Sequence, residues 1–195
     1  MLNRRRIIDA CTAVLAGVLV LAVALPLLAG SYIEVDFMRN GIGVVPGGFH
    51  FGQTGGGPDG KWAVVRDPDA VLGAAVEQYS TDVHEGRLPL AIYRGGPFRN
   101  LVATARFKLL DTTRSAGLAV RLVTAGDYYV AVANALEGRV DLFRFADGRR
   151  QRIAGVEATV AKRRWQTLQI TANENRFTVS LDGMPLFDAY DSAHA

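Results

Sequence analysis

Apolar and polar residues alternate along most of the chain after residue 31, and this period of two is typical of half-buried β-strands. The alternation is clearest near the C-terminus, where Leu168, Ile170 and Ala172 are separated by polar residues. It resumes at Phe177 after a short turn that contains two asparagines. This pattern predicts two antiparallel strands that cover a core with one apolar face.

Similar short runs fill the rest of the chain, and Gly, Asp and Asn residues separate them. No segment of useful length after residue 31 has the period of an amphipathic helix. Strands are predicted over residues 32–37, 61–67, 74–80, 100–110, 115–123, 127–134, 139–145, 164–172, 176–183 and 185–190, with a short one inside a Gly-rich loop over 45–62. Many short strands without helices predict an all-β fold, either an antiparallel sandwich or a barrel.

The first thirty residues differ, because three arginines at 4–6 precede an apolar run over 10–30. This pattern is typical of a signal peptide or a signal anchor, and we expect one N-terminal hydrophobic helix here. Residues 22–24 fit a small-residue cleavage site, whereas the whole run has about the 20 residues that span a bilayer. We favour cleavage, which divides the chain into a leader over 1–30 and a β-sandwich domain over 31–195. The domain is then expected outside the cytoplasm, periplasmic or secreted, or tethered to the membrane through the apolar run.

The net charge of +3 gives little reason to expect nucleic acid as a partner. Removing the leader takes away three arginines and one aspartate, which leaves 19 basic and 18 acidic residues and a net charge of +1. The sequence has no basic stripe interleaved with aromatic residues either. The single cysteine, Cys11, lies in the leader, so the domain has neither a disulfide nor a Cys-based metal site.

Several stretches of the chain carry a family resemblance: "RSAGLAVRLVTAGDYYVAVANALEGRVDLFRFADGRR", "RWQTLQI", "NRFTVSLDGMPLFDAYD" and, upstream, "GGGPDGKWAVVRDPDA". They resemble a bacterial family of exported concanavalin A-like jelly rolls. These are laminin-G/glucanase-like sandwiches, close to a domain of unknown function labelled as 3-keto-disaccharide hydrolase. The resemblance covers Val35 to Asp191 and implies an antiparallel jelly-roll sandwich.

The chain departs from this family pattern in two places. Relatives continue with further C-terminal strands, whereas this chain stops at "DSAHA". We therefore expect a C-terminally truncated domain with an open sheet edge or a partly exposed core. Val132 stands where the family pattern has an arginine, between the tyrosine pair and Asn134, so the face expected to hold a ligand has lost a polar group.

A ligand site is predicted on the strand over 127–134, because strand alternation places Tyr128 and Asn134 on one face. Arg121 lies on the preceding strand, and we expect its side chain on the same face. The resemblance implies that saccharides bind the concave sheet of such a sandwich. The predicted ligand-binding residues are Arg121, Tyr128, Asn134 and Glu137. An alternative assigns Tyr128 to packing, and Asn134 and Glu137 to a turn.

Few residues support catalysis. Hydrolysis of a glycosidic bond needs two carboxylates across the bond, and the glucanase relatives supply them from a Glu-x-Asp-x-x-Glu strand. The pairs Glu34–Asp36 and Glu137–Asp141 lack that spacing. Neither pair is therefore a strong candidate for acid–base chemistry.

A metal or cofactor site has little support either, and no cofactor is predicted. The three histidines are far apart in the sequence, so no pair has the spacing of metal ligands. Calcium is an option through Asp67, Asp69, Asp127 and Asp141, although nothing in their spacing singles out a site.

Three functional hypotheses follow. We favour a non-catalytic module that binds a saccharide or cell-envelope glycan. The alternative is a hydrolase acting on a sugar derivative, and it predicts that Arg121, Asn134 and Glu137 converge in one pocket. The third is a structural remnant without a ligand, which predicts a poorly closed sheet and marginal stability.

Overall fold

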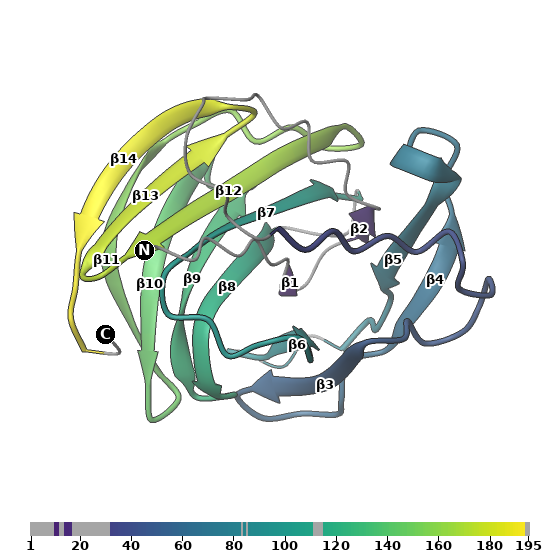
Figure 1. The fold of residues 1–195 in the computed structure, drawn as a ribbon, viewed down its shortest axis with the longest axis horizontal. Helices are drawn as coiled ribbons and strands as arrows, with labels where there is room; N and C mark the ends of the chain where they lie inside the picture. Colours follow the sequence, from purple (N-terminus) through teal and green to yellow (C-terminus); the bar gives the residue numbers. More distant parts are fainter. Residues whose placement is uncertain are drawn as a thin grey trace.

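Two antiparallel seven-stranded sheets pack face to face and form a β-sandwich (Figure 1). The computed structural model describes residues 10–11, 14–16, 32–82, 84, 86–110 and 115–193. The first sheet has the order β11 (Arg149–Glu157), β10 (Arg139–Ala146), β9 (Asp127–Asn134), β8 (Ser115–Thr124), β1 (Ala10–Cys11), β6 (Leu88–Tyr93) and β3 (Phe49–Thr54). The second has the order β14 (Met184–Tyr190), β13 (Arg176–Leu181), β12 (Trp165–Asn173), β7 (Leu101–Lys108), β2 (Val14–Ala16), β5 (Ala74–Gln78) and β4 (Trp62–Arg66). A 3-10 turn, Val71–Gly73, precedes β5. The predicted all-β antiparallel sandwich is confirmed.

The core lies between the sheets and is built from the alternate residues that the sequence pattern marks. In β9, Tyr129, Ala131 and Ala133 face this core. Tyr128 and Val130 belong to a second apolar cluster, which we call the outer cluster, on the other face of the first sheet. The predicted division of this strand into two faces is therefore confirmed.

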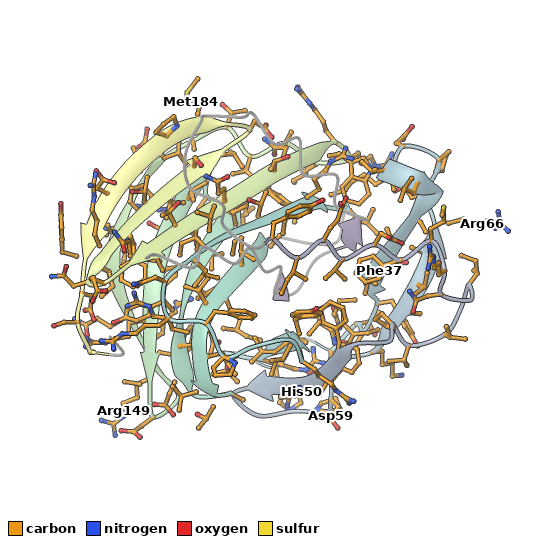
Figure 2. All side chains as sticks on the ribbon, viewed as in Figure 1. Phe37, His50, Asp59, Arg66, Arg149 and Met184 are labelled. Atoms are coloured by element: carbon orange, nitrogen blue, oxygen red, sulfur yellow. The ribbon has the colours of Figure 1, made fainter. Side chains whose placement is uncertain are left out.

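The predicted strand over 32–37 is wrong, because no strand forms there. The alternation in this segment nevertheless follows burial, since Glu34 and Asp36 are exposed and Phe37 is buried. Phe37 lies within the sandwich and packs against Phe49, with ring centroids 6.0 Å apart (Figure 2). A segment can alternate between core and solvent without a neighbouring strand to pair with, and hydrophobic patterning reports burial rather than pairing.

Among the strands after residue 31, β6 and β11 are not predicted by the alternation of apolar and polar residues. β6 reads Leu-Pro-Leu-Ala-Ile-Tyr, an almost continuous apolar run interrupted by Pro89. β11 begins with charged and polar residues and lies exposed at the edge of its sheet, as edge strands often do. The remaining predicted strands are confirmed, with ends that agree within two residues.

The expected N-terminal helix is not supported. Of the leader, the structure describes Ala10–Cys11 and Val14–Ala16, and both pieces are short strands. β1 pairs with β6 and β8 in the first sheet, and β2 pairs with β5 and β7 in the second. The expected cleavage site at 22–24 lies outside the described residues. Where the chain is described, no helix has the length and apolar character needed to cross a membrane.

Each sheet is bridged near its middle by one of these short strands (Figure 1). β1 pairs with two residues of each neighbour, Leu90–Ala91 of β6 and Gly117–Leu118 of β8. β6 continues to Tyr93 and β8 to Thr124, and no described strand lies between them beyond β1. This interruption of the first sheet positions the candidate site.

Candidate functional site

A bulge near the end of β8 shapes one wall of the site. Between Val120 and Thr124, β8 has three residues opposite a single residue of β9. Arg121 opens the bulge with a φ of 53°, in the left-handed region that residues with a Cβ rarely adopt. The bulge turns Arg121 away from the outer face predicted for it, and Leu122 packs against the outer cluster instead. The predicted side of Arg121 is therefore wrong.

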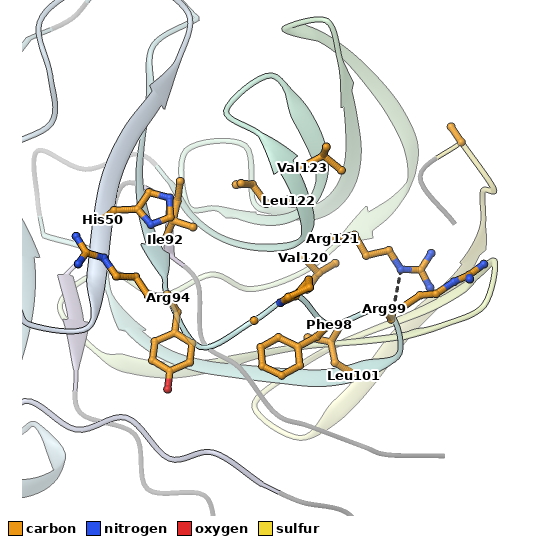
Figure 3. A pocket seen from close by; sticks show the side chains of 14 residues that line it. His50, Ile92, Arg94, Phe98, Arg99, Leu101, Val120, Arg121, Leu122 and Val123 are labelled. Atoms are coloured by element: carbon orange, nitrogen blue, oxygen red, sulfur yellow. Dashed lines mark hydrogen bonds between the residues drawn. The ribbon is translucent and has the colours of Figure 1, made fainter. Parts of the chain in front are cut away.

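A cleft of about 760 Å³ lies between the ends of β6 and β8 (Figure 3). His50, Ile92 and Arg94 form one wall, and the bulge residues 120–123 form the opposite wall. The ring of Phe98 lies between the two walls. This mixture of apolar surface with a few convergent polar groups is typical of small-molecule sites.

The charged side chains among the described residues that line the cleft are cationic. Arg94, Arg99 and Arg121 line it together with His50, and none of the described lining residues is acidic. Arg94 and Arg99 are exposed, and neither makes an ion pair with any residue that the structure describes. Charges of one sign beside low-dielectric walls concentrate their field, so the cleft favours anionic groups.

Arg121 is held by main-chain acceptors. Its Nε donates to the carbonyl of Arg99 at 2.9 Å, and its Nη2 donates to the carbonyl of Glu174. The guanidinium lies over Phe177, 5.0 Å from the ring centroid. Burial lowers the pKa of Arg121 and outweighs the opposing effects of Tyr129 and Glu174. The Nη1 atom is buried and has no hydrogen-bond partner within the described part of the chain.

Tyr128 offers no surface to a ligand. Its side chain is fully buried, and its ring stacks on Phe145 with centroids 4.7 Å apart. Its hydroxyl lies 2.7 Å from Oγ1 of Thr54, at hydrogen-bond distance. This geometry matches the packing alternative rather than the predicted ligand contact.

Asn134 and Glu137 lie at the other end of the sheet from Arg121. Oδ1 of Asn134 accepts the N–H groups of Leu136 at 3.0 Å and of Glu137 at 3.1 Å, which holds the turn after β9. Asn134 pairs with Ser115 at the start of β8, whereas Arg121 lies towards its end. The structure therefore does not bring the predicted ligand-binding residues together.

Neither carboxylate pair considered for catalysis has a suitable environment. Glu34 and Asp36 are exposed on a segment outside both sheets. Asp141 is buried, and its carboxylate accepts from Nε of Arg139 and Nε of Arg152, each at 2.7 Å. These ion pairs occupy the Asp141 carboxylate with structural partners.

The carboxylates of Asp67, Asp127 and Asp141, three of the four aspartates considered for calcium, are bound to protein groups. Asp67 forms an ion pair with Lys108 and accepts the N–H of Asp69 at 3.0 Å. Asp127 accepts the N–H of Asp147 at 3.0 Å. Among the described residues, no group of three or more His, Cys, Asp or Glu side chains is placed to hold a metal. Calcium binding stays a prediction without a located site.

The loop that completes the cleft lies outside every predicted strand and every predicted site residue. Residues 94–99 read Arg-Gly-Gly-Pro-Phe-Arg, a Gly- and Pro-containing loop that carries an aromatic ring between two cations. Binding residues concentrate on loops that a rigid scaffold positions, so this composition is a usable signal. Strand periodicity alone does not detect it.

Comparisons with known proteins support the fold. No protein-family model matches the chain, and no curated protein matches it either. Among solved structures, the chain is similar to the carbohydrate binding module CBM66 from Bacillus subtilis, with a TM-score of 0.56. The two sequences are 20% identical, and the similarity covers 73% of this chain and 80% of that chain. This similarity shows a common fold, and the resemblance to the 3-keto-disaccharide hydrolase domain is not confirmed.

Proposed function

We propose that this chain is a non-catalytic module that binds a saccharide in the cleft between β6 and β8. The observation that carries the proposal is the cleft itself, whose volume of about 760 Å³ lies in the usual range of ligand sites. The similarity in fold to a carbohydrate-binding module supports it.

The chemistry of the cleft suits a sugar ring. Tyr93 and Phe98 supply half-buried aromatic surface, and Ile92 and Leu122 add aliphatic surface. A sugar presents apolar C–H faces that pack on such groups. Its hydroxyls accept hydrogen bonds from guanidinium groups such as that of Arg94. The cleft therefore offers both kinds of contact that a saccharide makes.

The hydrolase alternative, including a 3-keto-disaccharide hydrolase, is less well supported. It requires Arg121, Asn134 and Glu137 in one pocket, but Asn134 and Glu137 lie at the opposite end of the sheet from Arg121. No acidic residue is found among the described residues that line the cleft. A glycosidase needs two carboxylates about the scissile bond.

We also propose that the module works outside the cytoplasm, as a secreted, periplasmic or membrane-tethered domain. This part of the proposal rests on the basic start and apolar run of residues 1–30, although the structure places Ala10–Cys11 and Val14–Ala16 of that run in the two sheets. It agrees with a saccharide ligand, because cell-envelope and environmental glycans are extracytoplasmic.

The proposal is tested by thermal unfolding and calorimetry with a panel of neutral and acidic oligosaccharides. At least one saccharide is expected to raise the melting temperature, because a ligand stabilises the state that it binds. Phe98→Ala should abolish the rise. Tyr79→Ala should keep it, because Tyr79 is an aromatic residue that does not line the cleft. No rise with any saccharide would overturn the proposal.

A second variant keeps the test conclusive if Phe98→Ala does not fold. Val123 is 73% exposed at the lip of the cleft, so Val123→Trp should fold normally while obstructing the opening. Loss of binding in Val123→Trp with an unchanged melting temperature of the free protein is expected. Release of a shorter product from any saccharide during incubation would contradict the non-catalytic assignment and favour the hydrolase.

A further inference from the structure

We propose that the cleft selects saccharides that carry a carboxylate, as the uronic-acid glycans do. This inference rests on the proposed function, since it names the ligand class of the same cleft. Its basis is the cationic lining of the cleft: Arg94 lies on one wall with His50 and Ile92, and Arg99 and Arg121 lie together on the opposite side (Figure 3). A neutral sugar has no need of three guanidinium groups around one cleft.

Glu174, whose charge acts on Arg121, and Asp191, two residues before the lining residue Ala193, are both bound by other side chains. The carboxylate of Glu174 accepts from Nδ2 of Asn100 at 2.9 Å. Asp191 accepts from Nη1 of Arg144 at 2.9 Å and from the hydroxyl of Tyr129. None of the described residues that line the cleft carries a carboxylate, and the charge of Glu174 only partly offsets that of Arg121, so positive charge in the cleft is available to a ligand.

The environment of Arg121 also favours an anionic ligand. Its guanidinium donates to two main-chain carbonyls, which satisfy donors without supplying a negative charge. Its buried Nη1 lacks a partner among the described residues, so the guanidinium is incompletely satisfied. A carboxylate in the cleft would offset the charge of this half-buried cation more fully than a neutral sugar hydroxyl would.

The two exposed arginines would make the direct contacts. A guanidinium can bind a carboxylate through two parallel N–H···O bonds, which are stronger than bonds to a neutral hydroxyl. Arg94 and Arg99 have the freedom to do so, because neither is paired with a described residue. Arg121 would act at longer range by raising the positive potential of the cleft.

The cleft is larger and more apolar than a small inorganic anion requires. Its volume of about 760 Å³ far exceeds the roughly 30 Å³ that one water molecule occupies in the liquid. The rings of Tyr93 and Phe98 offer apolar surface that an isolated anion cannot use. The small net charge of +3 also gives no electrostatic basis for nucleic acid as the anionic ligand. A sugar ring bearing a carboxylate uses both the aromatic surface and the cations.

The test compares acidic oligosaccharides with their own methyl esters by calorimetry on the full chain. Suitable probes are trigalacturonate, a guluronate trimer and a hyaluronan tetrasaccharide. Esterification removes the charge and leaves the rest of the sugar in place. We expect at least one acid to bind about 10-fold more tightly than its ester, which is the order expected for a charge-assisted contact. Raising the salt concentration should weaken binding of the acid and leave the ester unaffected.

Matched variants identify the side chains that favour binding of the acid over its ester. Arg94→Gln and Arg99→Gln should each weaken binding of the acid about 3- to 10-fold, since exposed ion pairs are modest, and should weaken any binding of the ester less. Arg164→Gln is the control, because Arg164 is also exposed but adjoins Trp165, which pairs with Lys108 at the opposite end of β7 from Leu101. A loss of acid binding in Arg164→Gln equal to that in Arg94→Gln would contradict the assignment.

The outcomes separate this inference from the proposed function. Equal binding of acid and ester, or binding of neutral saccharides alone, overturns the preference for carboxylates and leaves the saccharide-binding module intact. No binding of any saccharide overturns both. Displacement of the acid by an equal concentration of inorganic phosphate would show that the cleft recognises a bare anion, and it would also overturn the inference.

Discussion

The hydroxyl of Tyr129 donates to the carboxylate of Asp191, and this contact ties β9 of the first sheet to the chain just after β14 of the second. The ring of Tyr129 packs against Phe177 with centroids 4.5 Å apart. Nη1 of Arg144, on β10, donates to both oxygens of Asp191, at 2.9 and 3.1 Å. One carboxylate thus connects the two sheets at this side of the sandwich.

Asp191→Asn should destabilise the protein in a pH-dependent way. Burial raises the pKa of Asp191, but hydrogen bonds from Tyr129, the N–H of Ala193 and Arg144 outweigh burial and hold the pKa below its usual value. Such a carboxylate stabilises the folded state above the unfolded pKa of about 3.9, and the contribution is lost as the pH falls through the folded pKa. We expect Asp191→Asn to lower the free energy of unfolding by about 1–3 kcal/mol at pH 7.

The measurement is urea unfolding of both proteins at several pH values. The difference between them should narrow as the pH falls from the unfolded pKa of about 3.9 through the lower folded pKa of Asp191. Asp188→Asn is the control, because Asp188 pairs with Arg176 on the exposed surface and its loss should have a much smaller effect. A difference that stays constant across the pH range would contradict the role given to Asp191.

Tyr128→Phe should affect stability and leave saccharide binding unchanged. The variant removes a buried hydroxyl that lies 2.7 Å from Oγ1 of Thr54, while Thr54 keeps its bond to the carbonyl of Ala125. We expect a loss of about 0.5–1.5 kcal/mol in the free energy of unfolding. Tyr190→Phe, at an exposed position, is the matched control and should change neither quantity. Loss of saccharide binding at unchanged stability would restore Tyr128 as a ligand contact.

The regular part of the fold could be predicted from the sequence because burial on one face leaves a period of two. The strand pair around Leu168 and Val179 shows this, since its apolar residues are buried in the alternating pattern expected. β11 could not be predicted in this way, because a charged edge strand has no apolar face to reveal it. β6 is hidden for the opposite reason, since most of its residues are apolar.

The geometry of the candidate site depends on features that the alternation of apolar and polar residues does not reveal. The predicted side of Arg121 assumed an uninterrupted ladder, but β8 has three residues opposite a single residue of β9 at this point. The cleft arises because β1 fills only part of the space between β6 and β8. This gap depends on how segments that are distant in the sequence pair with one another. The turn alternative for Asn134, by contrast, could be stated from local sequence, because an Asn side chain often accepts nearby N–H groups.

Gly155→Ala should destabilise the pairing of β10 with β11. Gly155 pairs with Asp141, and a Cβ at this position would overlap Oδ1 of Asp141 and lie 2.8 Å from the carbonyl oxygen of Val140. The Asp141 carboxylate would have to move away from Arg139. We expect a loss of about 1–3 kcal/mol, measured by urea unfolding. Gly56→Ala is the control, because a Cβ there meets no atom within 4 Å. Equal stability of the two variants would contradict this close packing.

Removal of residues 1–31 should lower the melting temperature, because β1 and β2 bridge the two parts of each sheet. Without them, Leu90 and Leu118 lose their shared neighbour in the first sheet and expose unpaired main-chain groups. A loss of about 2–4 kcal/mol corresponds to a fall of roughly 5–15 °C for a domain of this size. A variant that lacks only residues 1–9 keeps both strands and is the control. If both variants melt like the full chain, the leader segment contributes nothing to the sandwich, and its removal as a signal peptide would leave the domain as stable as before.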